Sequence, residues 1–334
     1  FVLILKGLSN FKKYIVSVLL VLSFGTVSAQ DPHFTQFYAS PLFLAPSFTG
    51  GILGYRTVLN YRNQWTSIPG SYNTFSLSWD HNFIAFKSGL GFVAVRDQAG
   101  AGKLGNTKIG TLYSYDFTPT SEWHIRPGLG FYLQQISIDF SKLIFSDQLM
   151  DPGTPTSVAP PGNSAVWDID VATSVLAYSD NMWFGATWDH MLKPVASFYD
   201  EDSRTPYKFS VFGGYRYITK GFLMSRIEES ITFAFNFRVQ DIYRQLDLGL
   251  YWFTQPLSFG VWWRGMPKNS TTRRVDALAF MAGYKWDQVS LGYSYDFTVS
   301  KLGLNSGGSH EISFIYEFKV LTKKKWKAIP CPTF

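Results

Sequence analysis

The chain has 334 residues, of which 46% are hydrophobic and 18% aromatic, and its formal net charge is +6. Three lysines lie in the first 29 residues and five in the last 16, so the remaining body has a net charge of −2. A body without a basic excess excludes nucleic acid as the expected partner. The length suits a single large domain such as a barrel.

The first 29 residues have the order of a secretory signal. Lys6, Lys12 and Lys13 precede an apolar run over 14–24, and the small-residue pattern Val27-Ser28-Ala29 follows. The run is shorter than the roughly 20 residues that a membrane-spanning helix needs. The order therefore predicts an N-terminal signal peptide over 1–29, removed before Gln30, and an exported protein.

The next segment, 30–52, lacks the pattern of a spanning strand. Pro41 and Pro46 bracket an apolar stretch with no clean period, and proline is confined to strand edges and bulges. We expect an N-terminal periplasmic or plug segment that forms a turn and a short helix at the inner mouth of a barrel. Gln36, Tyr38 and the neighbouring aromatic residues would seal it there.

Residues 53–318 alternate apolar and polar positions from end to end. Phe75, Leu77 and Trp79, for example, alternate with serines and an aspartate. A soluble sandwich shows the same period, but here the apolar set is aromatic at strand ends and the other set is rich in Gly, Ser, Asp and Asn. The pattern therefore favours an all-β fold, a transmembrane antiparallel β-barrel of about 14 strands. The expected strands are 53–63, 73–82, 88–97, 106–117, 122–137, 166–178, 181–189, 207–217, 231–239, 243–252, 257–264, 276–285, 288–297 and 309–318.

The expected connectors alternate between long and short, which is typical of such barrels, whose longer loops face the cell exterior. Two of them break the rule, because 218–230 is long and 240–242 is short where the reverse is expected. The expected outer loops are 64–72, 98–105, 138–165, 190–206, 265–275 and 298–308. Inward residues such as Ser76, Ser78, Ser290, Gly292 and Ser294 are small and mostly neutral, unlike the charged lining of many porins.

Loops 138–165 and 190–206 far exceed the two to five residues that a hairpin needs. Their apolar, aromatic and charged side chains suit a partner-binding surface. An alternative is that both loops fold inward and close the lumen. The candidate partner-binding residues are Phe145, Leu149, Met150, Val158, Phe198, Tyr199, Asp200 and Arg204.

The sequence carries no motif of an enzyme. Asp80-His81 and Asp189-His190 offer an acid–base pair, but each follows a tryptophan and is typical of a barrel rim. No catalytic residue, cofactor or metal site is predicted. The last segment, 319–334, contains five lysines and loses the alternation, which predicts a basic, solvated periplasmic tail.

Four segments carry a resemblance to a known family: Gln30–Gly50, Tyr61-Arg62-Asn63-Gln64-Trp65, Asp97–Gly100 and Gly307–Ser313. With departures at Ala45 and Gln98, they resemble the PorP/SprF family of type IX secretion system membrane proteins. The tail Cys331-Pro332-Thr333-Phe334 resembles a family ending that often has Arg in place of Thr333.

The resemblance implies an outer-membrane barrel that supports export or cell-surface anchoring of cargo proteins through their C-terminal domains, and that is linked to gliding motility in some members. Further implied partners are outer-membrane lipids and periplasmic secretion components, including a peptidoglycan-binding lipoprotein. A passive channel for small or hydrophobic solutes stays open as the alternative.

Overall fold

The computed structural model describes residues 31–150, 164–198, 203–221, 228–269, 272–299, 304–319 and 329–331. The chain divides into a unit of residues 1–31 and a unit of residues 32–334. The predicted signal peptide lies outside the described residues. Among the described residues, no helix is long and apolar enough to span a membrane.

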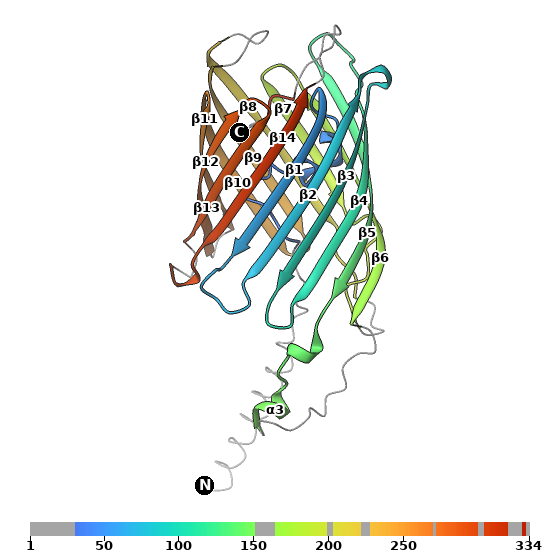
Figure 1. Cartoon of the computed structure of the whole chain (residues 1–334), viewed down its shortest axis with the longest axis vertical. Coiled ribbons are helices and arrows are strands. Elements are labelled where there is room, and N and C mark those ends of the chain that lie inside the picture. The colour runs from blue at the N-terminus through green and yellow to red at the C-terminus, as the bar shows by residue number, and fades with distance from the viewer. Residues whose placement is uncertain are drawn as a thin grey trace, which may run out of the picture. The chain divides into compact units, whose positions relative to one another are not determined.

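Fourteen antiparallel strands close into one barrel, each paired with its neighbours in the chain and the last with the first (Figure 1). The prediction of a 14-stranded barrel is confirmed. The strands are β1 (Gly54–Gln64), β2 (Tyr72–Phe83), β3 (Ser88–Ala99), β4 (Leu104–Tyr115), β5 (His124–Ser137), β6 (Ala165–Tyr178), β7 (Met182–Asp189), β8 (Lys208–Lys220), β9 (Glu229–Gln240), β10 (Tyr243–Thr254), β11 (Leu257–Asn269), β12 (Thr272–Trp286), β13 (Val289–Thr298) and β14 (Ser309–Lys319).

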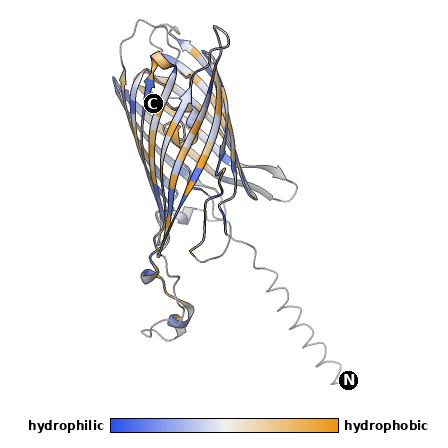
Figure 2. Ribbon diagram, turned by 90° about the vertical axis from the view of Figure 1, so that its right-hand side faces the viewer, coloured by the Kyte–Doolittle hydropathy of each residue, from blue (hydrophilic) through white to orange (hydrophobic). Residues whose placement is uncertain are grey.

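The alternation in the sequence becomes the two faces of the wall. In β2 the exposed residues Phe75, Leu77 and Trp79 point outward, and Ser76 and Ser78 between them are buried. Figure 2 shows hydrophobic and hydrophilic residues alternating along the strands. Closure between Gly54↔Lys319 and Gln64↔Ser309 leaves the sheet without a free edge, as an apolar solvent requires.

The two ends of the barrel differ, and we name them by their connectors. The long-loop end, the lower end in Figure 1, carries 65–71, 100–103, 138–164, 190–207, 241–242 and 299–308. The short-turn end, where β1 begins, carries 84–87, 116–123, 179–181, 221–228, 255–256 and 287–288. Both expected exceptions occur, at 221–228 and 241–242. Two more were not expected: the connector 100–103 is shorter than the predicted outer loop 98–105, and 116–123 is long for the short-turn end.

The prediction of an outer loop over 265–275 is wrong. Strand β11 continues to Asn269, and β12 begins again at Thr272. The pairing shifts register between Arg264 and Gly265 and again between Met266 and Asn269. Such β-bulges interrupt the period of two, which is why the alternation fades while the strands continue.

Residues 32–51 enter the barrel and fill its lumen; we call them the plug. They contain helix α2 (Pro41–Leu44) and the 3₁₀ turn η1 (Pro46–Phe48). Phe34, Phe37 and Phe48 are almost fully buried. A Cβ atom on Gly128 of β5 would lie 2.3 Å from the backbone nitrogen of Ser47, so only glycine leaves room for the plug backbone at this position of the wall.

Aromatic residues of the wall complete the filling of the lumen. Trp183, Phe212 and Trp262 are buried and pack over glycines of neighbouring strands. Phe37 and Trp262 meet edge to face at 4.7 Å, and Phe48 stacks on Phe212 at 5.5 Å. The hydrophobic core of this protein therefore lies inside the barrel, between the plug and the wall.

The C-terminal tail departs from the expectation of a solvated terminus. Lys319 still pairs with Gly54 in the sheet, so the barrel ends one residue later than expected. Ile329 and Cys331 are buried, Ile329 beside Gly51 of the plug. The backbone carbonyl of Cys331 accepts a hydrogen bond from Arg216 of β8. The solvated reading is wrong for 329–331, because these apolar side chains gain by leaving water; 320–328 and 332–334 lie outside the described residues.

Candidate functional site

The plug is held near the long-loop end by six charged side chains, five of them buried and Arg238 partly buried, which we call the outer ion cluster. Its members are Arg62, Arg238, Asp247, Arg264, Asp296 and Glu311. Asp296 lies 2.8 Å from Arg62 and 2.9 Å from Arg264, and Glu311 lies 3.2 Å from Arg62. Asp247 pairs with Arg238 at 2.9 Å and with Arg264 at 3.2 Å. Three cations thus face three anions, so the formal charges of the cluster balance.

Thr35 of the plug sits at the centre of this cluster. Its hydroxyl donates to Asp296, at 2.7 and 2.8 Å from the two carboxylate oxygens. The same oxygen accepts hydrogen bonds from Arg62 and Arg264. A hydroxyl has one donor and two acceptor sites, so all three are used. The backbone N–H of Thr35 also donates to Glu311, at 2.7 Å.

Gln36 extends the same attachment with a neutral side chain. Its backbone N–H donates to Glu311 at 2.9 Å, and its amide nitrogen donates to Ser294 at 3.2 Å. The hydroxyl of Ser313 donates to its amide oxygen. Glu311 and Ser313 are two residues apart on β14, so both point into the lumen. The inner face of this strand therefore binds both Thr35 and Gln36 of the plug.

A second attachment lies at the short-turn end, where the plug leads into β1. Asp80 of β2 accepts from the backbone N–H of Gly50 at 2.7 Å and forms a 2.9 Å ion pair with Arg56. Arg126 of β5 donates to the backbone carbonyls of Ser47 and Thr49. Buried polar groups are costly unless they are hydrogen-bonded, so the wall satisfies the backbone of the plug.

The expectation of a mostly neutral lumen is therefore wrong. The small residues do face inward, but they share the lumen with buried ion pairs. Three residues of this interface, Thr35, Arg62 and Glu311, lie in segments that carry the family resemblance. Those segments were the available signal, although nothing in them states that the three side chains meet.

His33 adds a pH-sensitive group to the plug. Burial, followed by the nearby charge of Arg264, lowers the pKa of His33 well below its ordinary value of 6.5. The docked plug therefore favours the neutral imidazole. Because an undocked His33 keeps an ordinary pKa, it takes up a proton first as the pH falls, and the docked state is favoured above pH 6.5.

We expect docking of the plug to weaken as the pH falls below about 6.5, by up to about tenfold per pH unit. The measurement is the frequency of transient openings of the purified barrel in planar bilayers between pH 7.5 and 5. His33→Asn should flatten this dependence. His81→Asn, which changes an outward residue stacked on Tyr55, should not, and equal slopes in both variants would contradict the assignment.

The two Asp-His pairs considered for catalysis do not form dyads. Asp80 points inward to Arg56, while His81 lies on the outer face and contacts the carbonyl of Gly54. His190 bonds to Asp170 at 2.8 Å, and Asp189 pairs with Lys208 at 3.2 Å. Over the described ranges, no group of three or more His, Cys, Asp or Glu residues is arranged to hold a metal.

The loops that were predicted to bind a partner touch one another at the long-loop end. Phe140 and Phe198 meet edge to face at 6.1 Å. Arg204 forms a 3.9 Å ion pair with Asp168 at the start of β6. In the other loop, the backbone N–H of Asp139 donates to the carbonyl of Gly102 at 2.8 Å. We call the described residues 138–150 and 190–198 with 203–207 the loop surface.

The structure places five of the eight candidate residues on this surface. Phe145 precedes helix α3 (Ser146–Met150) and is partly buried, and Leu149 within it is 70% exposed. Phe198 is partly buried and Arg204 exposed. Met150 ends α3, and its side chain is not described. Val158, Tyr199 and Asp200 lie outside the described residues. Ile144, 72% exposed, was missed by the sequence reasoning.

Comparison with one solved structure shows the same kind of fold at low sequence identity. The toluene transporter TbuX of Ralstonia pickettii aligns with a TM-score of 0.52 and 10% identity, covering 84% of this chain and 94% of that one. The P. putida toluene transporter TodX aligns with a TM-score of 0.48 and 8% identity, covering 83% of this chain and 93% of that one. The monoaromatic hydrocarbon channel CymD aligns with a TM-score of 0.48 and 10% identity, covering 84% of this chain and 93% of that one. No curated protein matches the chain.

A family model matches residues 26–316, nearly the whole chain, including the plug and all but the end of β14. Its description is type IX secretion system membrane protein PorP/SprF. The fold and the family place the protein in the outer membrane. The chain belongs to the PorP/SprF family of type IX secretion system membrane proteins.

Proposed function

We propose that this barrel is a closed docking component of type IX secretion, and that its loop surface binds the C-terminal domains of exported cargo at the cell exterior. The observation that supports this most is the contrast between the two regions. The lumen is filled by the plug and by wall aromatics, whereas the loops at one end present exposed apolar residues. Cargo would then be held on the barrel and not pass through it.

The loop surface has the composition of a protein-binding site. Ile144 and Leu149 are exposed large apolar side chains, and neighbouring exposed apolar groups favour a protein partner. The ion pair of Lys142 with Asp139 lies in the same loop, and Arg204 adds a charge in the other loop of this surface. An apolar centre with a charged rim gives affinity at the centre and selectivity at the rim.

The remaining partners belong to the opposite end. The proposed signal peptide, removed after residue 29, would deliver the chain to the periplasm. The short-turn end would then face the periplasmic secretion components, including the peptidoglycan-binding lipoprotein expected for the family. A contribution to gliding motility, which the family resemblance implies for some members, is part of the same proposal.

A passive channel for small or hydrophobic solutes is the competing function. It requires the plug to leave the lumen, against the two sets of hydrogen bonds described above. The likeness to the toluene transporter concerns the fold alone. Solute flux through the intact barrel would support the channel, and cargo binding to the loop surface would support docking.

We expect Ile144→Glu with Leu149→Glu to remove at least one protein from the cell surface while the barrel assembles normally. Two charges placed at an apolar contact must be desolvated on binding, which costs several kcal/mol. The measurement is quantitative mass spectrometry of surface-exposed proteins, with the gel shift between unheated and boiled samples as the folding check.

Ile242→Glu is the matched control, since Ile242 is 74% exposed at the same end but lies in the turn between β9 and β10. Cargo display should be normal in this variant. Replacing 139–163 and 191–204 by short Gly-Ser turns extends the test. Normal display without both loops, together with leakage of small solutes, would overturn docking and favour loops that close the lumen.

A further inference from the structure

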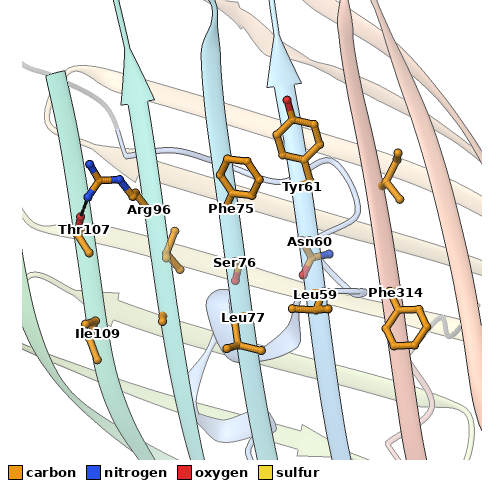
Figure 3. Close-up of a pocket in the computed structure, with 13 residues that line it drawn as sticks. Leu59, Asn60, Tyr61, Phe75, Ser76, Leu77, Arg96, Thr107, Ile109 and Phe314 are labelled. Carbon is orange, nitrogen blue, oxygen red and sulfur yellow. Dashed lines mark hydrogen bonds between the residues drawn. The ribbon is translucent and has the colours of Figure 1, made fainter. Parts of the chain in front are cut away.

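The outer wall of the barrel contains a groove that crosses five neighbouring strands, β14, β1, β2, β3 and β4 (Figure 3). Its volume is about 490 Å³, within the roughly 300–1,000 Å³ of small-molecule sites. The outward residues form two rows of directly opposed partners. One row is Phe314-Leu59-Leu77-Ala94-Ile109, and the other is Ile312-Tyr61-Phe75-Arg96-Thr107.

The groove exists because one side chain is small. Ala94 lies directly between Leu77 on β2 and Ile109 on β4. Both neighbours are exposed and reach outward beyond it, so the wall is hollowed at this position. A hollow of aliphatic and aromatic side chains on a membrane-facing wall suits a hydrocarbon chain.

A cation stands at one end of the hollow. Arg96 is an outward, exposed residue of β3, two positions along the strand from Ala94, which is roughly 7 Å. Phe75 and Thr107 oppose it on the neighbouring strands. Its guanidinium donates to the hydroxyl of Thr107 at 3.0 Å. Among the described residues this is its hydrogen-bond partner, which leaves further N–H donors directed to the surroundings.

The level of Arg96 in the wall corresponds to a membrane interface. The next row toward the long-loop end contains the polar outward residues Asn63, Asn73 and Gln98. The next two rows toward the short-turn end are apolar in most positions. An arginine on the lipid face costs little near the interface but about 2–4 kcal/mol at the midplane. Arg96 is therefore at the depth of lipid headgroups in the leaflet nearest the long-loop end.

We propose that this groove binds one anionic, phosphate-bearing lipid of that leaflet. An acyl chain would lie over Ala94 between Leu77 and Ile109, and the lipid phosphate would accept hydrogen bonds from Arg96. Arginine matches phosphate oxygens in pairs of parallel hydrogen bonds. The inference depends on the barrel being in a membrane and is independent of cargo binding by the loops.

The test is native mass spectrometry of the full-length barrel released from nanodiscs of dioleoylphosphatidylglycerol and dioleoylphosphatidylcholine. We expect the wild type to retain one phosphatidylglycerol in preference to phosphatidylcholine. Arg96→Gln should lower this retention roughly tenfold, because a charge-assisted hydrogen bond is lost. Ala94→Leu, which fills the hollow but keeps the charge, should lower retention of both lipids at this site.

Two variants elsewhere on the outer face separate the groove from general effects. Arg244→Gln removes an exposed charge on β10, and Ala186→Leu enlarges an outward residue on β7. Neither should change lipid retention. Equal losses in the matched pairs, or unchanged retention in Arg96→Gln, would overturn the proposal. So would a complex with a second copy of the chain that Ala94→Leu disrupts while lipid retention is normal, or tight binding of free glycerol phosphate in place of the lipid.

Discussion

Deletion of residues 33–51 is expected to turn a closed barrel into one that conducts small ions. These residues fill the space between the strands and contribute buried phenylalanines along the lumen. Without them, water can reach the ion pairs of the wall, which attract counterions. The measurement is single-channel current in planar bilayers, where the intact chain should show rare openings and the deleted chain a stable conductance.

A deletion can also prevent folding, so a second variant is needed. Gly128→Leu adds a side chain where even a Cβ atom meets the plug backbone at 2.3 Å. The strand itself can keep its hydrogen bonds, and the plug must move. Both variants should keep the gel shift of a folded barrel. A folded, plug-free barrel without current would show that Trp183, Phe212 and Trp262 close the lumen by themselves.

Most of the fold could be predicted because the information is local. Each strand of a lipid-facing barrel repeats the same period of two, so the 14 strands and the positions of most connectors follow from the sequence alone, although the lengths of several connectors do not. The predicted strand boundaries were wrong where the alternation of apolar and polar residues is interrupted. The β-bulges near Gly265 interrupt the alternation, so the ends of β11 and β12 were predicted as a loop. The buried tail residues Ile329 and Cys331 lie outside any strand and have no periodic pattern.

The candidate site could be predicted less well from the sequence, because its contacts join residues that are far apart in the chain. Thr35 and Glu311 are separated by 276 residues yet form a 2.7 Å hydrogen bond. The structure shows Arg62, Asp296 and Glu311 buried on the inner face of the wall, but alternation along single strands does not state what occupies the lumen. These three charges lie on three different strands, and Thr35 of the plug is their common partner. Strand patterns that do not include the plug give no sign that the charges form one cluster. The two long loops, 138–164 and 190–207, could be predicted because their length exceeds what a hairpin turn needs, and their role in binding a partner stays a prediction.

The contacts of Thr35 make one hydroxyl decisive for the docked plug. Thr35→Val keeps the volume and the β-branched shape but removes a group that donates to Asp296 and accepts from Arg62 and Arg264. Hydrogen bonds to charged groups contribute about 1.5–3 kcal/mol each, and buried donors that lose their acceptor are costly. We expect docking to weaken by about 3 kcal/mol, which corresponds to more than a hundredfold rise in the undocked fraction.

Thr49→Val is the matched control for that prediction, because Thr49 is a buried threonine of the same plug. Its hydroxyl has no hydrogen-bond partner among the described residues, so its removal should change docking by less than about 0.5 kcal/mol. Both variants are compared by open probability in bilayers and by the temperature at which the gel shift is lost. Thr35→Val should open frequently while the wall, which keeps its own ion pairs, stays folded. Equal behaviour of the two valines would show that apolar packing of Phe34, Phe37 and Phe48, and not the outer ion cluster, holds the plug in place.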